Sequence, residues 1–141
     1  YYDNNEFSTF ELFPVDDSDT YDGIQVIYLT NDKKYKIYSI SGVITCVKSF
    51  TICENYWRKI LPDLKNSFEK STYVNDRGEY SAQQDKTGKS KVTQINFEFN
   101  SGDRITLEKV KWSKKMNFID TVKVNIDTNK FVNWLNTKAY N

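Results

Sequence analysis

The sequence predicts an α+β domain with a mostly antiparallel sheet of about six strands and two helices packed on one face of that sheet. Two stretches, 93–100 and 121–126, alternate between apolar and polar residues with the period of a β-strand. A third stretch, 53–70, repeats its apolar residues with the spacing of a helix. The chain has 141 residues, 16% of them aromatic, and is therefore long enough to enclose one core.

The first part of the domain predicts a hairpin followed by a further strand. Strands are expected at 24–30 and 34–40, because β-branched and aromatic residues dominate both, and the polar residues 31–33 between them suit a turn. The 24–30 segment is apolar on both faces, so we expect it to be central and covered on both sides. Residues 42–47 predict a third strand.

A helix is predicted next, followed by a polar segment. The apolar residues that define one face of this helix are Trp57, Ile60, Leu61, Leu64 and Phe68. Pro62 interrupts the pattern, so we expect either a kink or two short helices. The polar stretch 75–91 is typical of a mobile loop or a weak hairpin.

The second half begins with a pair of strands. In 93–100 we expect the apolar residues to point inward and Gln94, Asn96 and Glu98 to point outward. A turn at 100–103 leads into a strand at 104–112. The apolar phase of that second strand shifts between its two halves, which predicts a β-bulge.

The chain is expected to end on a strand at 121–126 and a short helix. Asp127 or Thr128 is a suitable N-cap for this helix. The face that contacts the sheet is marked by Phe131, Trp134 and Leu135. Both halves of the chain then read strand, strand, strand, helix. This order predicts a pseudo-repeat of two βββα units.

Residues 1–22 are strongly acidic. They carry seven Asp and Glu side chains and no Lys or Arg, whereas the whole chain has a net charge of +1. We expect residues 23–141 to form a single α+β domain. The acidic segment is expected either to dock on a basic face of that domain or to precede it as a solvated tail.

Cys46 and Cys53 are the two cysteines of the chain. A structural zinc site normally takes four ligands, and the sequence has no His and no third Cys. A redox pair usually has the shorter Cys-x-x-Cys spacing. We therefore favour a disulfide, with two buried free thiols as the alternative. A disulfide indicates an oxidising compartment.

The absence of histidine removes the Ser-His-Asp and Cys-His catalytic arrangements and every His-ligated metal site. No complete catalytic or cofactor-binding motif is present, so we expect a non-enzymatic protein without a cofactor. One weak candidate metal site remains, in the acidic run of Asp16, Asp17, Asp19 and Asp22. The same carboxylates are candidates for acid/base catalysis, and a solvated turn is the alternative.

Tyrosine supplies the candidate binding surface. Exposed Tyr gives a large contact area at little cost in entropy, and Tyr is also a good strand former. The candidates are Tyr35, Tyr38, Tyr73 and Tyr80. Lysines in the second half invite a nucleic-acid interpretation, but the nearby Phe residues occupy the regular inward face of a strand, so no nucleic-acid partner is expected.

These observations predict an exported binding domain, periplasmic, extracellular or at the cell surface, that recognises another protein or envelope macromolecule. An inhibitor or immunity-type protein is one concrete form. A carboxylate-based enzyme or small-ligand binder using residues 16–22 is an alternative, and so is a structural subunit of a surface or secretion assembly. No apolar run is long enough for a transmembrane segment. The lack of an Asn-x-Ser/Thr site favours a bacterial source.

Overall fold

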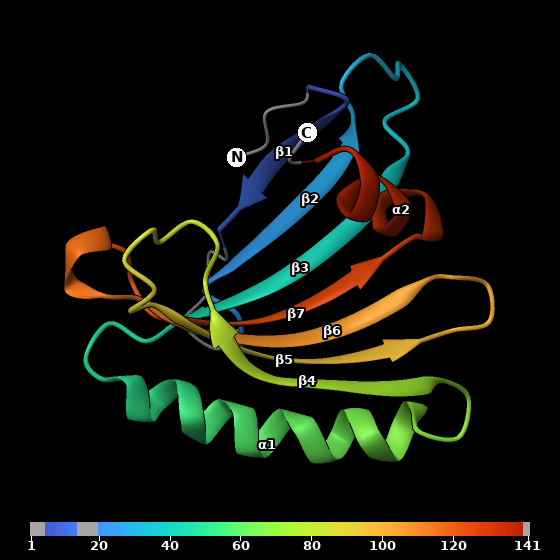
Figure 1. Ribbon diagram of the computed structural model, residues 1–141. Helices are drawn as coiled ribbons and strands as arrows, with labels where there is room; N and C mark the ends of the chain where they lie inside the picture. The colour runs from blue at the N-terminus through green and yellow to red at the C-terminus, as the bar shows by residue number, and fades with distance from the viewer. Residues whose placement is uncertain (1–4, 14–19, 140–141) are drawn as a thin grey trace.

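A computed structural model describes residues 5–13 and 20–139 of the chain (Figure 1). It contains seven strands, two α-helices and one short 3₁₀ helix, η1. In chain order these are β1 (Phe7–Leu12), β2 (Gly23–Leu29), β3 (Ile37–Thr45), α1 (Phe50–Phe68), β4 (Tyr73–Ser81), β5 (Lys91–Glu98), β6 (Arg104–Lys111), η1 (Lys114–Met116), β7 (Thr121–Asp127) and α2 (Asn129–Thr137).

All strands belong to one antiparallel sheet in the order β1-β2-β3-β7-β6-β5-β4, which confirms the predicted α+β class. The sheet has seven strands rather than six for three reasons. The acidic N-terminal segment contributes β1, and the polar stretch after α1 contributes β4, which forms a hairpin with β5. The two strands expected at 34–40 and 42–47 are a single strand, β3.

The helix α1 is continuous over 19 residues despite Pro62 inside it, so neither the expected kink nor a pair of short helices is needed to describe it. Its first turn is capped by Ser49, whose hydroxyl accepts a hydrogen bond from the Thr51 N–H at 3.0 Å. Pro62 is exposed, so the lost backbone hydrogen bond faces water. Apolar residues on both sides of Pro62, including Trp57 and Leu64, pack on the same sheet face and hold the two halves in line.

The two helices contact opposite faces of the sheet, which corrects the expectation that both pack on one face. α1 covers the face that carries Ile44, Leu107 and Val122. α2 packs on Ile27 and its neighbours, and Ile27 is the cross-strand partner of Ser39 in β3. Because side chains alternate along a strand, Ser39 and Ile44 point to opposite faces. In Figure 1, α1 accordingly runs below the sheet and α2 lies in front of β3.

The phase shift in β6 has a different cause from the predicted β-bulge. β6 pairs with both neighbours without a register shift. Its first half contributes Leu107 to the core under α1, and its second half contributes Val110 to a small cluster on the opposite face with Val92 and Trp112. Since both faces of β6 are partly apolar, no extra residue is needed. Register shifts occur instead between β2 and β3 and between β4 and β5.

The two halves of the chain are not equivalent, so the pseudo-repeat is not found. Three strands precede α1, and four lie between α1 and α2. α2 begins after Thr128, as expected from its sequence. The Thr128 hydroxyl makes no side-chain cap and instead donates a hydrogen bond to the Tyr38 carbonyl at 2.9 Å, which ties α2 to β3.

The boundary proposed at residue 22 stays a prediction. Within residues 1–22, β1 pairs with β2 along its whole length, and Phe7 contributes to the core beneath α2. Neither α1 nor α2 is long and apolar enough to cross a membrane, as far as the described residues extend.

Candidate functional site

One row of apolar side chains crosses the entire sheet on the α1 side. Each member is the cross-strand partner of the next, from the edge strand β1 to the opposite edge strand β4. The row consists of Phe10, Val26, Ile40, Ile126, Ile105, Phe97 and Val74. Such a row is the side-chain pattern of a buried sheet face.

Burial is uneven along this row. Under α1, Phe97 is 0% exposed and Ile105 is 6% exposed. On the adjacent strands, Ile126 is 57% exposed and Ile40 is 39% exposed. On β3 and β7, α1 lies over the end that carries Ile44 and Val122 and does not reach Ile40 and Ile126. The expectation that the 24–30 strand is covered on this face is met at Val26 in β2, which is 5% exposed.

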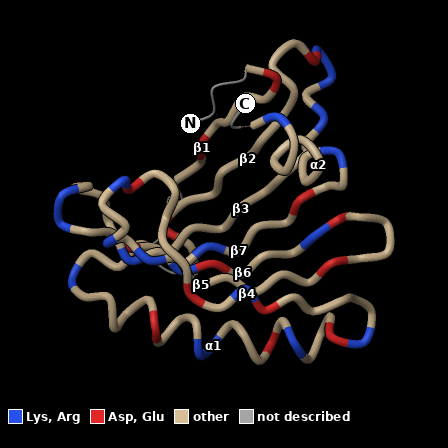
Figure 2. The backbone as a smooth tube through the Cα atoms, viewed as in Figure 1, with Lys and Arg blue, Asp and Glu red and all other residues tan. Residues whose placement is uncertain are grey.

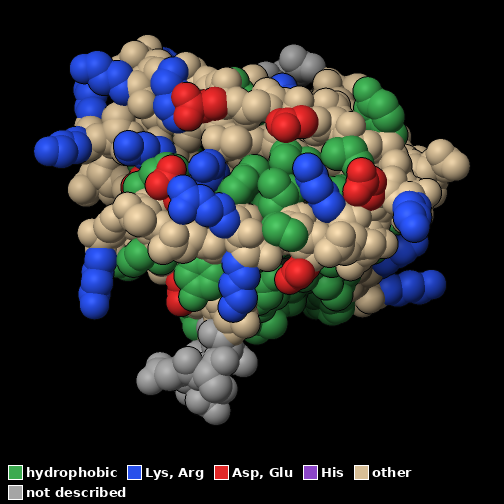
Figure 3. Space-filling model, turned by 90° about the horizontal axis from the view of Figure 1, so that it is seen from below, with side chains coloured by type: hydrophobic (Ala, Val, Ile, Leu, Met, Phe, Trp, Pro, Cys, Tyr) green, Lys and Arg blue, Asp and Glu red, His purple; other side chains and the backbone are tan. Residues whose placement is uncertain are grey.

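We call the exposed apolar side chains on and beside this part of the sheet the apolar patch. Its members lie on β1, β3, β7 and the loop between β2 and β3: Phe10, Leu12, Tyr35, Ile37, Ile40 and Ile126. Aromatic contacts join its parts, because the Tyr28 ring lies 5.9 Å from that of Phe10 and 5.8 Å from that of Tyr35. Seen from the α1 side, hydrophobic side chains lie among scattered Lys and Arg (Figure 3).

The loop that carries Tyr35 is ordered by Asp32. The Asp32 carboxylate accepts hydrogen bonds from the backbone N–H groups of Lys34 at 2.9 Å and Lys36 at 3.3 Å. Tyr35 has a positive φ of 48°, an uncommon conformation for a residue with a side chain. The loop also exposes Lys33 and Lys34, so one border of the apolar patch is basic.

The opposite face of the same sheet is polar. Its members come from β3, β5, β6 and β7, and we call them the polar face: Ser39, Ser41, Gln94, Asn96, Arg104, Thr106, Glu108, Lys123, Asn125 and Asp127. The short side chains of this face are buried although α1 packs on the other face of β6, and Gln94 and Asn96, expected to point into solvent, are among them. Acidic and basic positions lie side by side on β7 and β6 (Figure 2).

Asp127 is the best-connected group of the polar face. It accepts a hydrogen bond from the Ser39 hydroxyl at 2.6 Å and pairs with the Arg104 guanidinium at 3.2 Å. Burial nevertheless raises the pKa of Asp127, and the hydrogen bond from Ser39 and the charge of Arg104 only partly oppose this. The Arg104 Nε is buried and has no hydrogen-bond partner among the residues that the structure describes.

Glu108 and Lys123 are cross-strand partners on the polar face, but no ion pair joins their side chains. Burial raises the pKa of Glu108, and this effect outweighs the opposing charges of Lys123, Arg104 and Arg77. Beside them, Asn96 accepts hydrogen bonds from Gln94 at 2.8 Å and from Thr106 at 3.0 Å. These hydrogen bonds fix the side chains of Gln94, Asn96 and Thr106, whereas no ion pair fixes those of Glu108 and Lys123.

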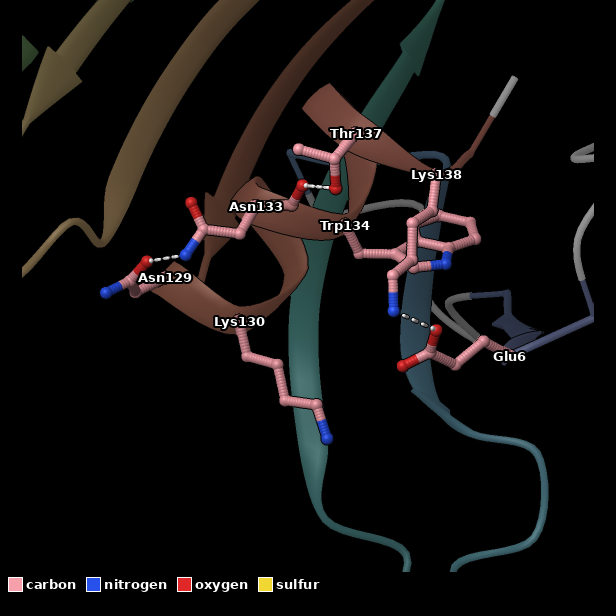
Figure 4. Close-up of a pocket in the computed structure, with 7 residues that line it drawn as sticks. All are labelled: Glu6, Asn129, Lys130, Asn133, Trp134, Thr137 and Lys138. Atoms are coloured by element: carbon pink, nitrogen blue, oxygen red, sulfur yellow. Dashed lines mark hydrogen bonds and ion pairs between the residues drawn. The ribbon is translucent and has the colours of Figure 1, made fainter. Parts of the chain in front are cut away.

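A shallow pocket lies beside α2 (Figure 4). It is lined by Glu6, Asn129, Lys130, Asn133, Trp134, Thr137 and Lys138. Lys138 Nζ and Glu6 Oε2 are 3.9 Å apart across it. The pair is partly exposed and contributes little to stability. Nothing in this set brings a carboxylate close to a nucleophile, so we do not assign chemistry to the pocket.

Asp85 organises the loop 82–90, which closes one end of the polar face. Its carboxylate accepts hydrogen bonds from the hydroxyls of Thr87, Ser90 and Ser113 at 2.6, 2.6 and 2.8 Å. These hydrogen bonds hold the pKa of Asp85 well below its usual range. The loop after β4 is therefore a cross-linked turn anchored to the segment after β6.

The predicted disulfide is present. Cys46 and Cys53 are bonded at an S–S distance of 2.02 Å and join the end of β3 to the first turn of α1. Both lie in the core beneath α1, where Cys53 is fully buried. The disulfide therefore holds the start of α1 against the sheet. Nothing around it indicates a reactive thiol.

Of the predicted acidic cluster, only Asp22 lies among the described residues; Asp16, Asp17 and Asp19 lie outside them. The Asp22 carboxylate accepts hydrogen bonds from the N–H and the hydroxyl of Thr45, at 2.6 and 2.7 Å. It thereby ties the start of β2 to the end of β3. Across the described ranges, no three His, Cys, Asp or Glu side chains group together in a way that could hold a metal ion.

The four candidate tyrosines occupy separate places. Tyr35 lies in the apolar patch, and Tyr73 is exposed at the start of β4, the opposite edge strand. Tyr38 is buried in the core beneath α2. Tyr80 is half-buried, and its hydroxyl donates to Gln94 at the polar face. The structure therefore does not unite them in one surface.

Sequence reasoning missed the apolar patch because its residues read as ordinary core positions. It missed the polar face for a related reason: alternate positions on strands were taken as solvated. One signal was available. Solvated strand positions usually carry Lys or Glu, whereas this face presents short hydroxyl and amide side chains in adjacent strands, such as Ser41, Asn125 and Thr106.

Comparison of the chain with protein-family models, with curated proteins and with solved structures finds no match.

Proposed function

We propose that the chain is an exported, non-enzymatic domain that binds another protein through the apolar patch. One observation carries this proposal: the apolar row that is buried at Phe97 and Ile105 under α1 continues to Ile126 and Ile40, where α1 does not reach and both side chains are exposed. Ile126 is more than half exposed although β7 is the central strand of the sheet. Contiguous apolar surface of this kind marks interaction sites in folded proteins.

The border of the patch supports a protein partner with acidic side chains. Lys33 and Lys34 stand beside Tyr35 at one border, and the patch itself holds large aromatic and β-branched side chains. Interfaces commonly combine such an apolar centre with a charged rim, which steers association and fixes orientation. An inhibitor or immunity-type role is a narrower form of the proposal.

The disulfide supports the exported compartment. Structural disulfides form and persist in oxidising environments such as the periplasm or the cell exterior. The bond between Cys46 and Cys53 lies in the core, where it serves structure rather than redox chemistry. The alternative hypothesis of a carboxylate-based enzyme relied on the acidic residues 16–22. Asp22 of that segment already accepts two hydrogen bonds from Thr45.

Site-specific photo-crosslinking in cells that produce the protein tests the proposal. A photoreactive amino acid at Ile126 is expected to trap one dominant protein, and the same probe at Ile119 serves as the control. The exposed fraction of Ile119, 52%, is similar to that of Ile126, 57%, but Ile119 lies outside the patch, in the η1–β7 loop. Ile40→Glu should abolish the product at position 126, since residues 40 and 126 are cross-strand partners.

Two results would contradict the proposal. A product that contains only a second copy of the chain would indicate self-assembly, and therefore a structural subunit. Equal labelling at positions 126 and 119 would mean that the patch has no specific partner. Size-exclusion chromatography at two protein concentrations separates these cases, because only self-association shifts the elution volume with concentration.

A further inference from the structure

The edge strand β1 presents a row of backbone groups that no described strand pairs with. β1 is the first strand of the sheet and pairs with β2 alone. The Thr30 N–H donates to the Glu6 carbonyl at 3.0 Å, one step beyond the Phe7–Leu29 pair of the β1–β2 register. In an antiparallel pair, the backbone bonds to the neighbour at every second residue. The N–H and C=O groups of residues 7, 9 and 11 therefore point outward from the sheet edge.

β1 lacks the features that protect the other edge of the sheet. β4 has a register shift between Asp76 and Gly78, carries Arg77 at that shift, and has a positive φ of 62° at Gly78. β1 pairs with β2 without a shift and contains neither Lys nor Pro. Its one charged residue, Glu11, accepts a hydrogen bond from the Gln25 side chain at 2.7 Å. Irregularities and charges keep an edge strand from pairing with another chain, so β1 is the edge that is open to pairing.

The side chains of β1 carry the apolar patch to this edge. Phe10 and Leu12 point to the α1 side and are 43% and 53% exposed. On the other side of the strand, Thr9 and Glu11 are polar and exposed. A strand added at the edge would lie about 4.8 Å from β1, so its alternate side chains would contact Phe10 and Leu12. The edge therefore fits a strand that is apolar on the α1 side and polar on the other.

We propose that the protein partner adds an extended segment to the sheet, beside β1. The backbone of this segment pairs with the outward groups of Phe7, Thr9 and Glu11, and its apolar side chains cover Phe10 and Leu12. In complexes of this kind the main-chain hydrogen bonds give affinity and the alternate side chains give specificity. The inference rests on the proposed function and adds the mode of binding, because a partner without a free strand would also cover the patch.

Photo-crosslinking at two positions of β1, in cells that produce the protein, tests the pairing. A photoreactive amino acid is placed at Ser8 in one variant and at Leu12 in another, since both side chains point to the α1 side. Mass spectrometry of each digested product identifies the linked residue of the partner. Paired strands advance together, so the two linked residues are expected in one segment of one protein, about four positions apart. Linked residues in unrelated segments would overturn the inference, and so would a product that contains only a second copy of the chain.

Thr9→Pro is the disrupting variant, and Thr9→Val is its matched control. The Thr9 N–H points outward, so proline removes a donor to the partner and no hydrogen bond to β2. Valine keeps this N–H and the size of the side chain. We expect Thr9→Pro to lower the yield of the product trapped at Ile126 about tenfold and Thr9→Val to leave it unchanged. Circular dichroism establishes whether both variants fold; if Thr9→Pro does not, the linked residues from positions 8 and 12 decide.

The outcomes separate this inference from the proposed function. If Ile126 traps one dominant protein but neither position of β1 does, the inference is overturned and the proposed function stands. The same holds if folded Thr9→Pro leaves the yield at Ile126 unchanged. If Ile126 traps no specific partner, the proposed function fails and this inference fails with it.

Discussion

The hydrogen bond between Ser39 and Asp127 gives a sharp test of the polar face. The two residues are 88 positions apart in the chain, and the Ser39 hydroxyl lies 2.6 Å from the Asp127 carboxylate in a buried setting. Ser39→Ala removes the donor and leaves the carboxylate with Arg104 alone. A hydrogen bond to a charged group contributes about 1.5–3 kcal/mol, so we expect the free energy of unfolding at neutral pH to fall by about 2 kcal/mol.

The matched control is Ser41→Ala. Ser41 lies two residues further along β3, on the same face and also buried, but it makes no side-chain hydrogen bond with a described residue. Loss of its hydroxyl should therefore change stability by less than about 0.5 kcal/mol. The comparison cancels the change in strand propensity, because both variants replace Ser by Ala in the same strand.

The effect of Ser39→Ala should depend on pH, and its sign follows from Asp127. Burial raises the folded-state pKa of Asp127 above its ordinary value near 3.8. The folded chain then binds the Asp127 proton more tightly than the unfolded chain does. The stability gained from this proton is therefore fully present below the unfolded-state pKa near 3.8 and is lost as the pH rises through the folded-state pKa. Ser39 favours the charged form, so its loss should cost least at low pH, about 1 kcal/mol, where the acid is neutral.

Urea unfolding at pH about 7 and pH about 4 measures both variants. The expected midpoint shift for Ser39→Ala at neutral pH is about 1 M urea, given a slope of about 2 kcal/mol per molar for a domain of this size. Equal destabilisation by Ser39→Ala and Ser41→Ala would refute the assigned role of the bond. A loss that is the same at both pH values would refute the claim that the charged carboxylate is the partner.

Three further predictions concern the scaffold. Replacing Cys46 and Cys53 by Ala opens an eight-residue loop and should lower stability by about 2.5 kcal/mol, or about 8 °C in Tm by calorimetry; an unchanged Tm would contradict it. Gly42→Ala places a Cβ 2.5 Å from the Tyr21 ring and should cost about 1–3 kcal/mol in urea unfolding, unless that ring moves freely. Asp85→Asn should speed hydrogen exchange in residues 82–90 and leave α1 unaffected, and protection that stays unchanged would argue against its role in the loop.

The sequence determined the class of fold and most of its elements. Strict alternation in 93–100 and 121–126 specifies strands, because a period of two places one set of side chains on one face. The helical spacing around Trp57 specifies α1, and the absence of other Cys and of His leaves the disulfide as the simplest state of Cys46 and Cys53. Each of these features is local, so neighbouring residues suffice to predict it.

The tertiary structure decided which faces are covered. Ile105 and Ile126 have the same chemistry and are cross-strand partners, yet α1 buries the first and leaves the second exposed. Gln94 and Asn96 were expected to point outward into solvent, but both are buried in the assembled sheet. Burial depends on where a helix of limited width lies across a seven-stranded sheet, and on contacts between residues far apart in the chain. Those contacts arise only when the strands assemble.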